Sequence, residues 1–180
     1  MIERVPGEGR YARLEREQRW VLSALPPEVQ RPVSIMDLYL PGTRLRLRRM
    51  VRQDTIVRKL AQKVRPDPTD PSMTKLTNVY LSEEEYAVLA ELGGDTVTKI
   101  RWRWSEGGRD LVVDEFAGPL AGLVVAEVEL DEEGPHHEAP ALAVADVTDD
   151  DRFSGGALSR TTAAQLGELL GELGALATGP

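Results

Sequence analysis

The clearest pattern along the chain is an alternation of charged and apolar side chains. In the segment TRLRLRR this alternation involves Arg44, Leu45, Arg46, Leu47 and Arg48. Successive side chains of a β-strand point to opposite faces of the sheet, so the three arginines share one face and the two leucines share the other. The same rule predicts further charged faces made by Lys99, Arg101 and Arg103, by Glu127 and Glu129, and by Glu15, Glu17 and Arg19.

Together with turn signals, this alternation predicts eight strands. They cover residues 11–22, 31–40, 44–53, 55–64, 75–82, 96–105, 109–118 and 123–131. Two prolines follow the first strand, PGT follows the second, and EGG, a hairpin signal, follows the sixth. The expected architecture is α+β, built around a predominantly antiparallel sheet with a few small helices.

Three segments are predicted to be helical. Residues 82–94, SEEEYAVLAELGG, begin with Ser82 as a cap, continue with acids that suit the positive end of the helix dipole, and end at two glycines. Residues 138–147 and 159–177 are also predicted as helices. The second of these carries leucines at helical spacing, at Leu166, Leu169, Leu170 and Leu173.

The composition indicates one globular domain. The chain has 180 residues, of which 41% are hydrophobic and 29% charged, and it shows no internal repeat. Because cysteine is absent, disulfides, thiolate metal sites and thiol nucleophiles are excluded, and a cytoplasmic location is expected. The charged N-terminus does not resemble a signal peptide, and no apolar run approaches the roughly 20 residues of a membrane span. We therefore expect no membrane partner.

Charge is distributed unevenly along the sequence. The net charge is −8, which argues against general nucleic-acid binding. Residues 44–65 nevertheless contain nine Lys or Arg against one acid, whereas residues 105–180 contain three Arg against sixteen Asp or Glu. A fold that brings these regions together can hold an anion on one wall and a cation on the other.

Like charges at neighbouring cross-strand positions are destabilising, and solvated sheet faces usually interleave the two signs. A solvated face of a structural sheet protein is one interpretation of the arginine strands. The alternative is a closed or nearly closed barrel whose basic face surrounds a polyanion, with the leucine and tryptophan faces packed outward under the helices.

Short motifs in consistent order then resemble a known family. LEREQRW, with Glu15, Glu17 and Arg19, resembles the ExExK signature of the CYTH or triphosphate tunnel metalloenzyme superfamily. The similarity continues through DLYL, RLRLR, LAQKV, KIRWR, VDEFAGPLAGL, AEVEL and ADVTDDDRF. It spans residues 14–158, so a domain over residues 14–180 is expected after an N-terminal extension of residues 1–13.

The resemblance implies an eight-stranded antiparallel β-barrel that binds a triphosphate and cleaves it with Mg²⁺ or Mn²⁺. The implied substrate-binding residues are Arg46, Arg48, Lys63, Lys99 and Arg101, with Arg44 as a rim contact or a solvated side chain. Hard cations prefer oxygen ligands. The implied ligands are Glu15, Glu17, Glu127, Glu129 and Asp146. The catalytic set is Tyr39, which orients the attacking water, together with Arg19 and Lys63.

The sequence also departs from the family pattern. Leu76 and Asn78 occupy positions where related sequences carry glutamates, and Asp146 stands where they carry a longer acid. Leu76, Asn78 and Tyr80 are expected to face the lumen, which predicts a depleted metal site.

Several functions therefore remain open. The leading prediction is a metal-dependent hydrolase of inorganic tripolyphosphate or a small organic triphosphate. The alternatives are a class IV-type adenylyl cyclase on the same scaffold and a non-catalytic polyphosphate-binding module. The expected partner is a small triphosphate or short polyphosphate, and the expected state is a monomer or homodimer. His136 and His137 lie in a proline and glycine loop, which favours solvated side chains over a metal site.

Overall fold

The computed structural model describes residues 5–67, 69–131 and 133–174. The strands are β1 (Arg13–Leu22), β2 (Gln30–Tyr39), β3 (Leu45–Arg52), β4 (Thr55–Val64), β5 (Met73–Tyr80), β6 (Asp95–Glu106), β7 (Arg109–Phe116), β8 (Val124–Glu129) and β9 (Ala143–Asp146). The helices are α1 (Glu83–Ala90), α2 (Gly155–Leu158) and α3 (Ala163–Glu172), with short 3₁₀ turns η1 (Gly118–Leu120) and η2 (Asp151–Phe153). The part of the predicted terminal helix beyond residue 174 lies outside the described residues.

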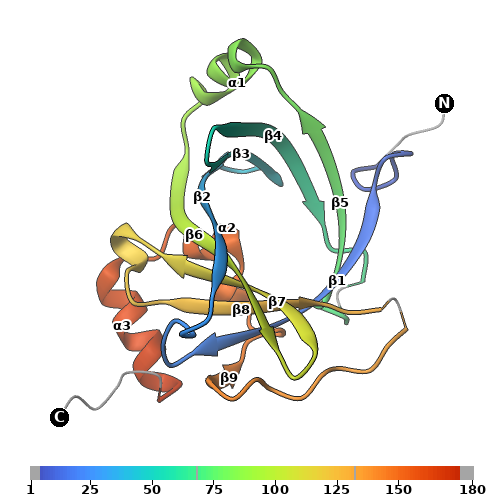
Figure 1. Cartoon of the computed structure of the whole chain (residues 1–180). Helices are drawn as coiled ribbons and strands as arrows, with labels where there is room; N and C mark the ends of the chain where they lie inside the picture. Colours follow the sequence, from blue (N-terminus) through green and yellow to red (C-terminus); the bar gives the residue numbers. More distant parts are fainter. Residues whose placement is uncertain (1–4, 68, 132, 175–180) are drawn as a thin grey trace.

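Eight strands form a closed antiparallel barrel, as predicted (Figure 1). The hydrogen-bonded order is β5-β4-β3-β2-β6-β7-β8-β1, and a further pairing of β5 with β1 closes the ring. The two strands meet where Arg13–Arg16 of β1 pair with Met73–Leu76 of β5. Closure satisfies the backbone groups of both edges and leaves a lumen faced by alternate residues of every strand.

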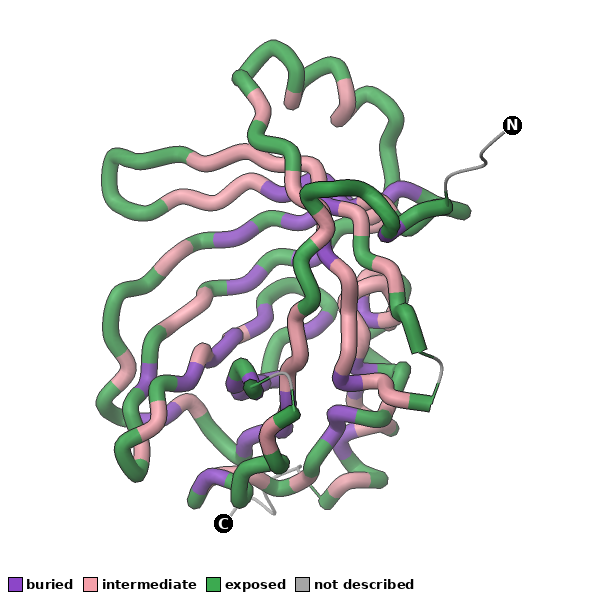
Figure 2. The backbone as a smooth tube through the Cα atoms, turned by 90° about the vertical axis from the view of Figure 1, so that its right-hand side faces the viewer, coloured by how far each residue is buried: buried purple, intermediate pink, exposed green. Residues whose placement is uncertain are grey.

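The strands form where the alternating pattern predicts them. Figure 2 shows buried and exposed positions alternating along several strands. Helix α1 also begins as predicted, because Ser82 and Glu85 form a reciprocal capping box. No helix in the described part of the chain is both long and apolar enough to cross a membrane.

Two apolar clusters pack against the outside of the barrel. One surrounds Trp20 and Trp104 and lies under the segment that includes Leu142 and Ala143. The other is built on Leu38 and Leu47 of β2 and β3 and is covered by α1. The tryptophan and leucine faces are thus outside the lumen, as the alternation predicts.

A third apolar cluster fills part of the barrel interior. Val97, Phe116 and Val125 line the lumen, and they share a buried cluster with Leu158 of α2 and Leu166 of α3. Sequence analysis assigned helices to the outer faces only. The last two helices instead cover one end of the lumen, and Figure 1 shows α2 behind the ring of strands.

The helix predicted for residues 138–147 is wrong. Ala143–Asp146 form strand β9, which pairs antiparallel with Trp20–Leu22 of β1. At these residues β1 has no β5 partner, so β9 supplies the missing backbone hydrogen bonds. The alanine-rich composition suggested a helix, but the need to satisfy this strand edge outweighs that preference.

Candidate anion-binding cavity

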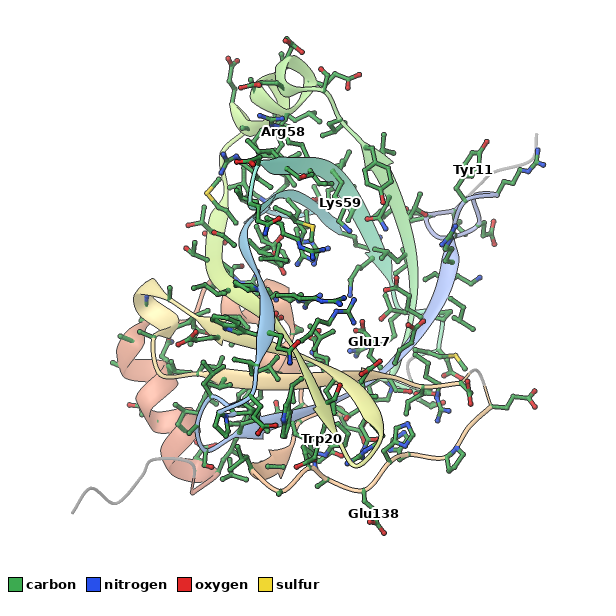
Figure 3. The ribbon with its side chains drawn as sticks, in the orientation of Figure 1. Tyr11, Glu17, Trp20, Arg58, Lys59 and Glu138 are labelled. Atoms are coloured by element: carbon green, nitrogen blue, oxygen red, sulfur yellow. The ribbon has the colours of Figure 1, made fainter. Side chains whose placement is uncertain are left out.

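The barrel encloses a polar cavity of about 670 Å³, within the range of about 300–1,000 Å³ of small-molecule sites. Ten basic side chains line it, namely Arg19, Arg44, Arg46, Arg48, Lys59, Lys63, Arg65, Lys99, Arg101 and Arg160. The four acids in the lining are Glu15, Glu17, Glu127 and Asp151. In Figure 3 Lys59 and Glu17 lie on opposite sides of the central space.

One group of cations is held by Asp37. This carboxylate is 1% exposed, and it accepts hydrogen bonds from Nε and Nη2 of Arg48 at 2.5 and 2.6 Å. Arg46 Nε lies 3.5 Å from the same carboxylate but makes no hydrogen bond. Burial alone would raise the pKa of Asp37, but the hydrogen bond from Arg48 and the charges of both arginines lower it to about 2.

A second group is held by Asp114, which is also 1% exposed. It accepts hydrogen bonds from Lys99 and, at 2.6 and 2.7 Å, from two nitrogens of Arg101. Burial opposes ionisation of Asp114, but the charges of Lys99 and Arg101 outweigh it and lower the pKa of this carboxyl. Arg101 also donates to Glu127 at 2.8 Å. Two buried carboxylates therefore orient Arg48, Lys99 and Arg101 by hydrogen bonds, and Arg46 lies beside one of them; the sequence assigns all four to substrate binding.

The acidic part of the lining comes mainly from β1 and β8. Burial and the nearby charge of Glu127 raise the pKa of Glu17, whose closest cation is Lys63 with Nζ at 4.0 Å. A cation bound between Glu17 and Glu127 would relieve the repulsion between these two carboxylates. In the described ranges, however, no three His, Cys, Asp or Glu side chains gather closely enough to hold a metal by themselves.

Two predicted metal ligands lie away from the cavity. Glu129 is exposed at the end of β8 and is not part of the lining. Asp146 is exposed on β9, where it accepts from Gln18 Nε2 at 2.9 Å and from the Thr148 amide at 2.9 Å. The side chains that remain as candidate ligands are those of Glu15, Glu17 and Glu127.

Arg19 and Tyr39 line the cavity near its covered end. Arg19 donates to the carbonyls of Thr148 and Phe153 at 3.2 and 3.1 Å, so this guanidinium anchors the segment before α2. Burial raises the pKa of Tyr39. Its hydroxyl lies directly against Gly155, where an added Cβ would be 1.9 Å away.

Lys59 is a lining residue that sequence analysis missed. It pairs across the strands with Arg48, and it forms no ion pair within 4.0 Å among the described residues. Burial and the charges of Arg48 and Arg46 lower the pKa of Lys59 to about 8. The resemblance selected Lys63, and the period of β4 places Lys59 on the same face, so strand period was the signal that could have found Lys59.

Leu76, Asn78 and Tyr80 of β5, which were all expected to face the lumen, differ in how they lie relative to the cavity. Leu76 lines the cavity, as predicted. The Asn78 Oδ1 atom is buried without a hydrogen-bond partner, although Asn78 is not among the lining residues. Tyr80 pairs with the lining residue Lys59 and shares its face, but its side chain is 73% exposed at the end of the strand and is not part of the lining.

The fold and the cavity define a class of protein, a closed antiparallel barrel with a strongly basic lumen and an acidic strip. The structure is similar to crystal structures of the hypothetical protein NE1496, with a TM-score of 0.58, and the inorganic triphosphatase NE1496, with a TM-score of 0.56, both at 22% identity. The alignments cover 82% and 81% of this chain and 99% and 93% of those chains. At this identity the similarity establishes the shared fold. No family model and no curated protein sequence matches the chain.

Proposed function

We propose that this protein is a divalent-metal-dependent triphosphatase of the CYTH type that acts on tripolyphosphate or a small organic triphosphate. The observation that carries the proposal is the concentration of ten basic side chains around one enclosed cavity in an otherwise acidic protein. The shared fold with the inorganic triphosphatase NE1496 supports the same conclusion.

In this proposal, Arg46, Arg48, Lys99 and Arg101 bind phosphate oxygens. Arginine forks suit phosphate because they donate two parallel hydrogen bonds. Asp37 fixes the direction of Arg48, and Asp114 fixes that of Lys99 and Arg101, before the anion enters. A prearranged site loses less side-chain entropy on binding.

The donor set fits a divalent metal that is shared with the substrate. Mg²⁺ is commonly held by one or two carboxylates together with phosphate oxygens and water. Glu15, Glu17 and Glu127 supply carboxylates on one strip of the lumen, opposite the basic strands. When bound there, the metal would polarise a phosphoryl group and help to activate water.

Two side chains are suited to handling water and protons. Tyr39 is protonated at neutral pH, and burial raises its pKa further above the ordinary value, so its hydroxyl can donate to a phosphate oxygen or orient a water. Because its pKa is lowered to about 8, the Lys59 amine can take up or release a proton in the cavity near that pH.

The test is to incubate the pure protein and Mg²⁺ or Mn²⁺ with tripolyphosphate, ATP or thiamine triphosphate and to assign the products by phosphorus NMR. We expect orthophosphate from at least one of them. Cyclic AMP with pyrophosphate would instead indicate a cyclase. Loss of activity on adding a chelator, and its recovery with metal, would establish the metal requirement.

Non-catalytic polyphosphate binding is the second candidate. It is favoured by the separation of Glu129 and Asp146 from the cavity and by the lack of a three-ligand cluster in the described part of the chain. Tight binding of tripolyphosphate without turnover under any metal condition would support this function over hydrolysis.

A further inference from the structure

The basic lining continues from the buried interior to an exposed rim. Arg46 and Arg48 are 9% and 5% exposed, whereas Arg44, at the start of the same run, is exposed. Lys63 is also exposed, and its backbone N–H donates to the Arg44 carbonyl at 3.2 Å. The two rim residues are therefore neighbours on adjacent parts of the barrel.

These cations follow one another in regular rows along β3 and β4. The row formed by Arg48 and Lys59 is followed by the row of Arg46 and Ala61. The next row is that of Arg44 and Lys63. Each row is two residues further along the strand, so the basic track extends for about 13 Å at about 3.3 Å per residue. A track of like charges with this shape is complementary to a linear polyanion.

Two further arginines extend the rim beyond the last row. Arg65 follows β4, and Arg160 follows α2. Both are exposed and both line the cavity. Arg65 donates to Asp151 at 2.8 Å, so a side-chain carboxylate already occupies one of its donors. That carboxylate is exposed and can be displaced by phosphate.

The lining favours an inorganic chain over a nucleotide. Its aromatic side chains in the described part of the chain are Tyr39, Phe116 and Phe153. The two phenylalanines are buried in the apolar cluster, and Tyr39 packs against that cluster and Gly155. None presents a free ring face at the rim on which a base can stack.

Building on the proposed function, we infer that the rim is a second subsite for linear inorganic polyphosphates longer than three units. Arg46, Arg48, Lys99 and Arg101 bind the terminal phosphates of the chain. Arg44, Lys63, Arg65 and Arg160 bind the phosphates that leave the lumen beside α2, where these exposed residues line the part of the covered end that stays open. A longer chain displaces Asp151 from Arg65.

The test is calorimetric titration with pyrophosphate, tripolyphosphate and tetrapolyphosphate in the presence of a chelator, so that no hydrolysis occurs. The wild-type protein should bind tetrapolyphosphate about tenfold more tightly than tripolyphosphate, the lower end of what one charge-assisted contact contributes. The double variant Arg65→Gln/Arg160→Gln should lose this gain, so its affinity for tetrapolyphosphate should fall about tenfold more than its affinity for tripolyphosphate.

The matched control is Arg10→Gln/Arg31→Gln, which removes the same charge from two exposed arginines outside the cavity. The control should keep the gain for tetrapolyphosphate. The inference would be overturned if the wild type bound tripolyphosphate and tetrapolyphosphate with equal affinity. It would also be overturned if the rim variant lost affinity equally for these two anions. Either result would leave the proposed triphosphate site intact. Failure to bind any of the three anions would overturn the proposed function as well. Thermal unfolding of each variant checks that it is folded.

Discussion

At the scale of single residues, the two lumen arginines of β3 have different partners. Arg48 donates hydrogen bonds to both oxygens of the buried Asp37, whereas Arg46 Nε lies 3.5 Å from the same carboxylate without a hydrogen bond. Repulsion between like charges alone would make the removal of either arginine favourable in the empty protein. The structure changes this expectation for Arg48, because Asp37 would be left buried without its main counterion.

We therefore predict unequal effects of Arg48→Met and Arg46→Met, in which methionine preserves much of the side-chain volume. Arg48→Met should lower the free energy of unfolding by about 3–5 kcal/mol, as when one member of a buried ion pair is removed. Arg46→Met should lower it by clearly less, about 1 kcal/mol, since it removes the 3.5 Å ion pair with Asp37 but no hydrogen bond from Nε. Urea unfolding measures both, and similar losses would contradict this assignment of partners.

Lys59 gives a prediction for the pH dependence of stability. Its pKa falls from 10.5 to about 8 on folding, so between these values the unfolded chain binds more protons than the folded protein. The free energy of unfolding attributable to Lys59 should therefore increase as the pH rises from 8 to 10. The comparison is with Lys59→Met, which removes this titration and leaves other alkaline effects in place. Parallel stability curves for the two proteins would show that Lys59 is not perturbed.

At the scale of elements, the period-two pattern was sufficient to predict β1 to β8. It also placed Arg46, Arg48, Lys99 and Arg101 on inward faces, because the face of a strand residue depends only on its parity and on which face is apolar. The pattern could not predict β9, whose pairing depends on the point at which β5 leaves β1. It also missed Asp37 and Asp114 as counterions, since cross-strand partners are set by register.

The short helix α2 was missed because four residues are too few for a helical period. Its position explains the first of the two glycines with which it begins. An added Cβ at Gly155 would lie 1.9 Å from the Tyr39 hydroxyl and 2.8 Å from the ring, while the nearest atom to a Cβ at Gly156 is 4.0 Å away. Close packing of Tyr39 against α2 therefore requires glycine at position 155 alone.

We predict that Gly155→Ala lowers the free energy of unfolding by about 1–3 kcal/mol through overpacking. Gly156→Ala should be neutral within about 0.5 kcal/mol, as for substitutions that disturb no packed contact. Because the closest clash is with the hydroxyl, Tyr39→Phe in the Gly155→Ala background should recover part of the loss. Urea unfolding of this double-mutant cycle provides the coupling energy, and additive effects would mean that Tyr39 and Gly155 do not contact each other.

At the scale of the whole molecule, closure of the barrel brings the basic segment of residues 44–65 opposite carboxylates of β1 and β8. The regional charges in the sequence anticipated these two walls. They could not reveal that Glu129 lies outside, because strand parity gives the face of a residue but not its depth along the lumen. The closed barrel therefore offers an anion wall over most of its surface and a narrow strip of acid around Glu17 and Glu127.

This separation predicts that anion binding and turnover respond in opposite directions to the loss of one acid. Glu17→Gln removes a negative charge from the lumen, so tripolyphosphate binding in a chelator should tighten by about two- to fivefold, as expected for one partly screened charge. If the proposed triphosphatase function is right, turnover with saturating Mg²⁺ should fall by about a hundredfold, because a carboxylate proposed to hold the metal is lost. The control is Glu129→Gln, which makes the same chemical change at an exposed position outside the cavity. Calorimetry measures binding and orthophosphate release measures turnover. If Glu17→Gln and Glu129→Gln behave alike in both measurements, the acidic strip is not the metal-binding wall.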